Sequence, residues 1–494
     1  MKALISALSA LELASAIKAK EIGVTEAVRA CIDGIENDNK KLNAFLTVSK
    51  EKALARAEEV QARLLAGETL SPLAGVPVAV KDNISTLGIE TTCASKMLQG
   101  YTPVFNAAVI DRMEEAGMIV VGKLNMDEFA MGGSSETGIA GPVRNPWDTA
   151  RVAGGSSGGS AAAVSARAVP VALGSDTGGS IRQPCSFCGT TGIKPTYGAV
   201  SRYGLVAYAS SLDQIGPIGR DINDCAALLS VISGPDKRDS TCIIERPFDF
   251  AAAFANHAAG LMGVKIALPV NYFSGGIDAD VKERVLAASE TLLAAGAELT
   301  EFEMPLMDAV IPAYYTIACA EASSNLSRYD GLKYGYRSAK AATLSEVYNL
   351  SRDEGFGLEV KRRIMLGSFV LSSGYYDAYY RKALQARALL KEAYNKIFER
   401  FDMVLSPVAP TTAYALRENV DDPMKMYLGD IYTVSVNLAG LPAVSLPCGI
   451  DAKGLPVGFQ LIGNAFSEEK LVRTARVYQR CTHHHRKPPG GDVV

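Results

Sequence analysis

Two tracts rich in glycine and serine are the segments whose residue types and spacing point to chemistry. The first is Gly154-Gly-Ser156-Ser157-Gly-Gly-Ser160, and the second, Asp176-Thr-Gly-Gly-Ser180, places Ser180 24 positions after Ser156. Tracts of this composition are often flexible linkers, but both lie beside strongly apolar segments, which argues against a linker. A buried tract brings backbone close to its neighbours and exposes amide N–H donors. A serine in such a turn has the surroundings of an oxyanion hole.

A serine hydroxyl is a weak nucleophile unless a base takes its proton, and the chain offers few histidines for that task. The four histidines are His257, His483, His484 and His485, the last three in the C-terminal tail. Lysine is the alternative base, and Lys81 ends the apolar stretch 75–80. A free lysine has a pKa of about 10.4, so only about one molecule in two thousand is neutral at pH 7. Burial lowers that pKa because it disfavours the charged form.

Local sequence alone leaves a second interpretation of Lys81 open. A lysine at a strand end is more often solvated or ion-paired, and Asp82 follows it directly. The motif Cys185-Ser-Phe-Cys188 is also ambiguous, but no second pair or histidine cluster completes a redox or zinc site. The nine cysteines are dispersed and odd in number, which predicts no disulfide framework and fits a reducing cytoplasm. The sequence therefore predicts no metal site.

Charge and hydropathy exclude several classes of protein. The 50 basic and 53 acidic residues nearly balance, which argues against nucleic-acid binding through the chain's own surface. No run of 18 or more apolar residues predicts a membrane span. The apolar N-terminus is interrupted by Glu12 and lacks a convincing cleavage site, so an amphipathic helix is expected rather than a signal peptide. The segment Gly117–Lys123 matches GxxxxGK, but it is strand-like and lacks the following Ser or Thr.

An α/β core is expected to position the candidate residues. Residues 1–65 read as helices, whereas short β-branched runs alternate with helical patterns from residue 73 onward. The expected strands are 75–80, 118–121, 169–173, 403–406, 443–447 and 456–462. The expected helices include 50–65, 107–116, 160–168, most of 275–400, and 467–479. Since there is no internal repeat or long low-complexity linker, one large domain is expected.

The chain resembles the amidase signature family over essentially its whole length. The resemblance is carried by Lys81 and the two tracts, in this order and spacing, with the second tract continuing to Arg182. The resemblance implies an α/β fold with a central mixed β-sheet covered by helices on both faces, and an N-terminal helical segment, 1–65, packed on an amidase domain, 66–494. It implies that Ser180 is the acyl-forming nucleophile and that Lys81 is the neutral base. Ser156, preceded by a cis peptide bond, would be the bridging serine between them. The oxyanion donors it implies are the backbone N–H groups of Thr177, Gly178, Gly179 and Ser180.

Three further segments, 125–131, 201–214 and 359–367, are similar to one branch of that family, the glutamine-hydrolysing subunits of tRNA-dependent amidotransferases. In this branch an arginine and an aspartate bind the two ends of glutamine, and the matching residues here are Arg363 and Asp430. A guanidinium can bind an α-carboxylate in bidentate fashion, and a carboxylate accepts from an α-ammonium group. Without the resemblance both residues would be taken for surface charges. The adjacent Arg362 leaves the identity of the arginine open by one position.

The same resemblance implies the working context. Glutamine would be the substrate, and its ammonia would pass to a B subunit, where ATP and Mg²⁺ serve to activate misacylated Glu-tRNA(Gln) or Asp-tRNA(Asn). A C subunit would complete the complex, and the tRNA would be bound mainly through the partner. This chain would need no cofactor of its own. The complex would work in the cytoplasm. Two alternatives stay open. One is a stand-alone amidase that does not need Arg363 and Asp430, and the other is a catalytically silent scaffold, against which the intact serine–serine–lysine set argues.

Overall fold

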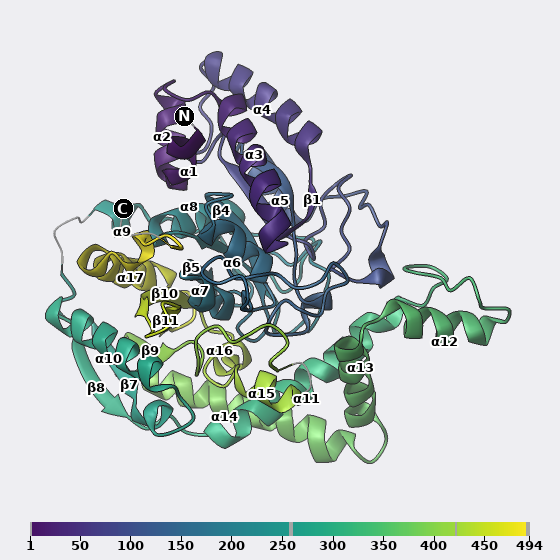
Figure 1. Ribbon diagram of the computed structural model, residues 1–494. Helices are drawn as coiled ribbons and strands as arrows, with labels where there is room; N and C mark the ends of the chain where they lie inside the picture. The colour runs from purple at the N-terminus through teal and green to yellow at the C-terminus, as the bar shows by residue number, and fades with distance from the viewer. Residues whose placement is uncertain (1, 256–259, 420–421, 491–494) are drawn as a thin grey trace.

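One mixed β-sheet runs through the part of the chain that the computed structural model describes, residues 2–255, 260–419 and 422–490 (Figure 1). Its order is β1-β3-β2-β4-β6-β5-β10-β11-β9-β7-β8. The strands are β1 (Phe45–Val48), β2 (Pro77–Lys81), β3 (Ile119–Leu124), β4 (Val171–Asp176), β5 (Thr191–Lys194), β6 (Gln214–Gly219), β7 (Lys265–Pro269), β8 (Glu298–Phe302), β9 (Met403–Pro407), β10 (Ala443–Ile450) and β11 (Pro456–Gly463). Strands β2, β3 and β4 are parallel, as are β7, β8 and β9.

Helices cover both faces of this sheet, because its central strands are apolar on both sides. In β2, Val78 and Val80 pack into one hydrophobic cluster and Ala79 into another, following the two-residue period of a strand. Helices α3 (Val24–Leu42), α4 (Lys50–Leu65) and α6 (Gly158–Ser165) contribute to the cluster of Ala79. Helices α5 (Ala108–Glu115), α8 (Ile222–Ile232) and α17 (Glu468–Thr482) contribute to the cluster of Val78. The predicted α/β class is thus confirmed.

The remaining helices lie at the N-terminus, beside the second half of the sheet, and in an arm that projects from the body and contains α12 and α13 (Figure 1). They are α1 (Lys2–Ala7), α2 (Ala10–Lys18), α7 (Arg182–Cys188), α9 (Ala251–Ala255), α10 (Ala279–Ala294), α11 (Met307–Asn325), α12 (Leu344–Gly355), α13 (Leu358–Leu371), α14 (Arg381–Phe398), α15 (Pro423–Leu428) and α16 (Val434–Ala439). The expected helical character of residues 275–400 is confirmed apart from β8. No helix of the described residues is long and apolar enough to cross a membrane.

The N-terminal segment differs from the sequence prediction in two places. Residues 45–48, expected to be helical, form β1 and pair antiparallel with β3, with Phe45 opposite Leu124. Four residues are too few to show a strand period in the sequence. The first helix is also two helices, α1 and α2, because Ser9 caps α2 in a reciprocal box with Glu12. The acid that interrupts the apolar N-terminus therefore starts a helix.

The parallel strands β2, β3 and β4 end at the same edge of the sheet, and the candidate residues gather there. Lys81 ends β2, Asp176 ends β4, and the segment after β3 leads to Asp127. The loop that carries Ser156 comes directly before α6 and crosses the same edge. The carboxyl edge of parallel strands is where α/β folds commonly bind their ligands.

Candidate active site

Lys81 and Ser156 are in direct contact at this edge. The Lys81 Nζ lies 2.8 Å from the Oγ of Ser156 and 2.9 Å from that of Ser157, and it donates to the carbonyl oxygen of Ser175 at 3.3 Å. All three polar partners and Lys81 itself are buried. The peptide bond between Gly155 and Ser156 is cis, as the family resemblance implies. The geometry allows Lys81, once neutral, to accept a proton from Ser156.

Burial lowers the pKa of Lys81 to about 7, although the carboxylates of Asp127, Asp176 and Asp213 act in the opposite direction. About half of the molecules therefore carry a neutral amine at pH 7, against about one in two thousand for a free lysine. Asp82, which the local sequence offers as the ion-pair partner of Lys81, instead lies 3.2 Å from the Nζ of Lys123. The ion-paired interpretation of Lys81 with Asp82 is therefore wrong, because Lys123 takes that carboxylate.

The loop of Ser156 is clamped by close backbone contacts. A Cβ atom on Gly155 would lie 2.1 Å from the Oδ2 of Asp127, so only glycine fits there. The N–H of Gly155 donates to the side-chain oxygen of Gln183 at 2.9 Å, and the N–H of Asp127 donates to the carbonyl of Ser156 at 3.3 Å. These contacts explain why the first tract is rigid and not a linker.

Ser180 lies in the turn between β4 and α7. It is 8 % exposed, and its carbonyl accepts from the N–H of Ser157 at 3.1 Å, which places it beside the loop of Ser156. In the described part of the chain its hydroxyl has no hydrogen-bond partner, so the oxygen is free to meet a substrate. Ser180 thus lies beside the loop whose Ser156 contacts Lys81, at the same edge of the sheet.

The four amides expected as oxyanion donors are not equivalent. The N–H of Gly179 already donates to the Oδ1 of Asp176 at 2.8 Å. The amides of Thr177, Gly178 and Ser180 have no such partner within the described ranges, so they are available for the role of oxyanion donor that the family resemblance implies. Gly179 itself is required for the turn, since its φ is +132° and a Cβ would lie 2.4 Å from the hydroxyl of Thr433.

A buried ion pair fixes this turn. Arg182 donates to both carboxylate oxygens of Asp176, through Nε and Nη2, each at 3.1 Å. Burial alone would raise the pKa of Asp176, but the guanidinium outweighs it and holds the pKa well below the usual range. Arg182 also donates to the carbonyl of Thr433 and to the side chain of Gln460, so it ties the turn to the C-terminal strands. Arg182 appears in the sequence signature without a role, and this geometry supplies one.

Replacing Asp176 by asparagine is expected to lower the free energy of unfolding by about 3 to 5 kcal/mol, because it leaves the guanidinium of Arg182 buried without its counter-charge. Both side chains are 0 % exposed. Denaturant unfolding of the variant measures the loss. The matched control is Asp377→Asn, which breaks an exposed pair with Arg381 (2.9 Å) and should leave the free energy of unfolding nearly unchanged. Equal effects of the two substitutions would contradict this role of Asp176.

The structure decides between the two adjacent arginines of α13. Arg363 is 3 % exposed, and its guanidinium donates to Glu359 at 2.8 Å and to the hydroxyl of Tyr208 at 2.6 Å. Arg362 binds the other oxygen of Glu359 from the outside of the helix, with 37 % of its side chain exposed. Neighbours on a helix point about 100° apart, so only one of them can face inward. Arg363 is the inward residue.

Asp430 joins the same cluster through an aromatic side chain. The hydroxyl of Tyr315 donates to its carboxylate at 2.8 Å, and the guanidinium of Arg363 lies over the Tyr315 ring, 5.3 Å from the centroid. Burial raises the pKa of Asp430 to about 7. Asp430 also lines a cavity of about 400 Å³ together with Gly133 and Gln183, so this cavity reaches the clamp around the loop of Ser156. Its size is that of a small-molecule site.

Thr433 connects the Asp430 segment with the turn of Ser180. Its hydroxyl oxygen lies 2.6 Å from the carbonyl of Gly178 and 3.1 Å from the carbonyl of Asp430. On the other side, the Asp213 carboxylate accepts from the hydroxyl of Thr177 at 2.7 Å and from the N–H of Tyr208 at 2.9 Å. Both candidate ligands of glutamine are thus linked by hydrogen bonds to the turn of the candidate nucleophile.

Several of these residues were not singled out from the sequence. Tyr315, Tyr427 and Glu359 surround Arg363, and Thr433, Asn437 and Gln183 fix the two catalytic loops. Only their place could have pointed to Glu359, which begins a motif segment, and to Gln183, which directly follows Arg182. The others are distant in sequence from their partners and carry no local pattern.

The cysteine pair and the histidines, to which the sequence assigns no catalytic role, can be located in the structure. Cys185 and Cys188 are buried, unpaired and part of the core beneath α7. Among the described residues no group of His, Cys, Asp or Glu side chains is placed to hold a metal ion. His257 lies outside the described residues. In the tail, His483 and His484 are exposed, whereas His485 is half-buried.

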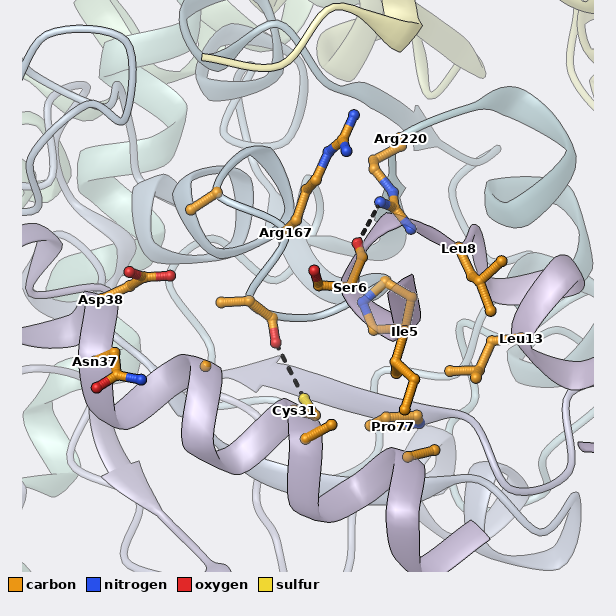
Figure 2. A pocket seen from close by; sticks show the side chains of 16 residues that line it. Ile5, Ser6, Leu8, Leu13, Cys31, Asn37, Asp38, Pro77, Arg167 and Arg220 are labelled. Carbon is orange, nitrogen blue, oxygen red and sulfur yellow. Dashed lines mark hydrogen bonds between the residues drawn. The ribbon is translucent and has the colours of Figure 1, made fainter. Parts of the chain in front are cut away.

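A second cavity, of about 420 Å³, lies away from these residues, between α1, α3 and the end of α6 (Figure 2). The thiol of Cys31 donates to the carbonyl of Ala168 at 3.0 Å, and Arg220 donates to the carbonyl of Ser6 at 2.8 Å. Dashed lines mark both hydrogen bonds in Figure 2. Arg220 thus satisfies carbonyls at the end of α1, as cations near helix C-termini commonly do. None of the predicted site residues lines this cavity.

Comparison with known proteins gives consistent results in sequence and in structure. The model of the family described as Amidase matches residues 26–472. The chain is 56% identical over 473 residues to the A subunit of the glutamyl-tRNA(Gln) amidotransferase of Agathobacter rectalis, covering 96% of this chain and 93% of that protein. A relative from Carboxydothermus hydrogenoformans with the same name is 53% identical and covers 98% of this chain and 99% of its own length.

Among solved structures, the chain is similar to the A subunit of the glutamyl-tRNA(Gln) amidotransferase of Thermotoga maritima, with a TM-score of 0.79 and 41% identity over 97% of this chain and 95% of that one. The peptide amidase of Stenotrophomonas maltophilia has a TM-score of 0.83 at 29% identity and covers 98% of each chain. The fold is therefore shared by amidases with different substrates, and the substrate must be argued from the site.

Proposed function

The chain belongs to the amidase family, and from this premise we propose that it is the glutamine-hydrolysing A subunit of a tRNA-dependent amidotransferase. The observation that carries the proposal is the pair of charges, Arg363 and Asp430, that Tyr315 joins beside the turn of Ser180. A general amidase has no need of two buried charges of opposite sign next to its nucleophile. A free amino acid needs both. The names of relatives more than 50% identical support the same assignment.

The proposed reaction uses the lysine–serine–serine relay. Neutral Lys81 takes the proton of Ser156, Ser156 takes that of Ser180, and the Oγ of Ser180 attacks the side-chain amide carbon of glutamine. The free amides of the Thr177–Ser180 turn stabilise the oxyanion of the tetrahedral intermediate. The C–N bond then breaks as the relay returns the proton to nitrogen, and ammonia leaves. Water, deprotonated by the same relay, attacks the γ-glutamyl ester and releases glutamate.

Arg363 and Asp430 would select the substrate by its two ends. Glu359 and Tyr208 hold the guanidinium from one side, leaving its remaining N–H groups for an α-carboxylate. Asp430 would accept from the α-ammonium group, and the positive charge of that group favours the ionised form of a carboxyl whose pKa is about 7. Together they orient the side-chain amide toward Ser180.

Replacing Arg363 by glutamine is expected to raise the KM for glutamine by about a hundredfold while kcat changes much less, because the lost contact is made in ground state and transition state alike. Ammonia release at varied glutamine concentration measures it. The matched control is Arg362→Gln, the adjacent outward arginine, which should leave KM near that of the wild type. A larger effect at position 362 than at 363 would refute the assignment of the carboxylate ligand.

The partner chains are part of the proposal. Ammonia would pass to a B subunit that activates the misacylated tRNA with ATP and Mg²⁺, and a C subunit would complete a cytoplasmic heterotrimer. The printed names of the relatives, which describe one subunit of a larger enzyme, support an assembly. So do the exposed apolar side chains of α13 and of the segment after it, among them Leu358, Met365, Phe369 and Tyr379. Exposed apolar side chains that lie together are typical of an interface.

A stand-alone amidase is the second candidate, and the same fold in a peptide amidase favours it. The two functions differ in their need for Arg363. If a simple aliphatic amide is hydrolysed as well as glutamine, and Arg363→Gln leaves both rates unchanged, the second candidate is correct. Glutamine as the better substrate, with two further chains that co-purify, supports the first.

A further inference from the structure

Glu128 is a buried carboxyl group with no part in the mechanism above, and it spans two parts of the fold. It follows Asp127 in the segment after β3 and is 2 % exposed. One of its oxygens accepts from the hydroxyl of Ser95. The other accepts from the backbone N–H of Gly357 at 2.8 Å, across 229 positions of sequence. Gly357 directly precedes the first residue of α13.

The N-terminus of α13 has no cap of its own. Gly357 occupies the N-cap position and offers no side chain, so the first N–H groups of this 14-residue helix need another acceptor. A carboxylate is the preferred acceptor there, because it also meets the positive end of the helix dipole. Glu128 supplies this cap from a distant segment. Burial raises the pKa of Glu128 to about 7, and the bonds from Ser95 and Gly357 counteract part of that rise.

The contact explains the glycine at position 357. Its backbone φ is −72°, a conformation open to any residue, so the turn itself does not require glycine. A Cβ there would lie 2.3 Å from the Oε2 of Glu128. Any side chain at position 357 would push the carboxylate off the helix.

The helix that Glu128 caps also carries Arg363 and Glu359 on its buried face. The residue before Glu128, Asp127, accepts from the N–H of Ser135 at 2.8 Å and contacts the loop of Ser156 through its own N–H. The dipeptide 127–128 thus contacts the loop of Ser156 through the backbone N–H of Asp127 and the helix that carries Arg363 through the side chain of Glu128.

We infer that Glu128 is a positioning residue of the glutamine site, which caps α13 and thereby sets the position of Arg363 relative to the nucleophile. The inference rests on the proposed function, because it matters only if Arg363 binds the α-carboxylate of the substrate. It predicts an effect on glutamine binding that acts through Arg363 and through nothing else.

The test is a double-substitution cycle on the full chain in its complex, with ammonia release as the readout. Glu128→Ala is expected to raise the KM for glutamine about tenfold, equivalent to about 1.4 kcal/mol, with little change in kcat. Glu128→Gln keeps an acceptor for the N–H of Gly357 and should restore most of the affinity. In the Arg363→Gln background, Glu128→Ala should raise KM no further, since residues that act as a unit are not additive.

Two further variants complete the test, one as an alternative to Glu128→Ala and one as a control. Gly357→Ala displaces the carboxylate without removing it, and it should raise KM even if Glu128→Ala fails to fold. Thr343→Ala is the control, because it removes the cap of α12 in the same arm, where the Thr343 hydroxyl accepts from Glu346. It should leave KM unchanged.

The outcomes distinguish a failure of this inference from a failure of the proposed function. If the effects of Glu128→Ala and Arg363→Gln on KM simply add, or if kcat falls as much as KM rises, Glu128 is not a positioning residue for Arg363. If Arg363→Gln raises KM but neither Glu128→Ala nor Gly357→Ala does, this inference fails while the proposed function stands. If Arg363→Gln leaves KM unchanged, the proposed function fails first.

Discussion

The Ser180→Ala variant is expected to release almost no ammonia from glutamine, with kcat lowered by at least about a thousandfold. Ser180 is the serine of the β4–α7 turn, and its hydroxyl is free for attack beside the loop of Ser156. Without this oxygen no γ-glutamyl ester forms. The amides of the turn would then assist only a direct attack by water, which is far slower. Ammonia production by the reconstituted complex is the measurement.

A second serine of the same tracts provides the control. The hydroxyl of Ser160 donates to the carbonyl of Leu173 at 3.0 Å, within the packing of α6 on the sheet. Ser160→Ala should therefore cost some stability and leave kcat near that of the wild type. Release by Ser180→Ala at the wild-type rate would remove the proposed nucleophile, whatever the control shows.

Replacing Lys81 is expected to be nearly as damaging, by about a hundredfold to ten-thousandfold in kcat. Lys81→Met removes the amine that contacts Ser156 at 2.8 Å. Lys81→Arg keeps the charge, but a guanidinium does not give up its proton in the accessible pH range and cannot act as the base. For the wild type, kcat/KM should rise with pH through about 7, because only the neutral amine accepts a proton. Rates measured from pH 5.5 to 9 check this.

The same pKa shift predicts the sign of an effect on stability. Burial lowers the pKa of Lys81 to about 7 in the folded state, below its value in the unfolded chain. The buried ammonium therefore weakens the fold fully below pH 7, and this cost disappears as the pH rises toward the unfolded value. Lys81→Met carries no such cost, so its stability relative to the wild type should be greater at pH 6 than at pH 9.

Two results on activity would contradict the role of Lys81 as the base. One is ammonia release by Lys81→Arg, and the other is a wild-type rate that does not depend on pH.

The sequence was informative where the chemistry is local. The two glycine and serine tracts and Lys81 could be identified because glycine, serine and a strand-end lysine are unusual together within apolar surroundings. The alternation of short apolar runs with helical patterns predicted the α/β class, and the sheet confirms it. The strand of residues 45–48 was missed because four residues between two long helices show no period.

Features that depend on distant partners could not be predicted. Arg362 and Arg363 are equivalent in sequence, and the burial of Arg363 and its contact with Tyr208, 155 positions away, mark the inward one. The sequence leaves Asp82 open as a partner of Lys81, whereas the structure places Lys123 beside that carboxylate. The hydrogen bond from the Gly179 amide to the Asp176 carboxylate has no signal in the sequence. The cap that Glu128 gives to α13 joins residues 229 positions apart.

The covalent intermediate is the most direct test of the central claim, that this chain hydrolyses glutamine through Ser180. The complex is mixed with excess glutamine, quenched in acid during turnover, digested and measured by mass spectrometry. A γ-glutamyl ester on the peptide that carries Ser180, absent from the Ser180→Ala variant, is the predicted result. Steady ammonia release with no adduct at Ser180, or with the adduct on a cysteine instead, would contradict it.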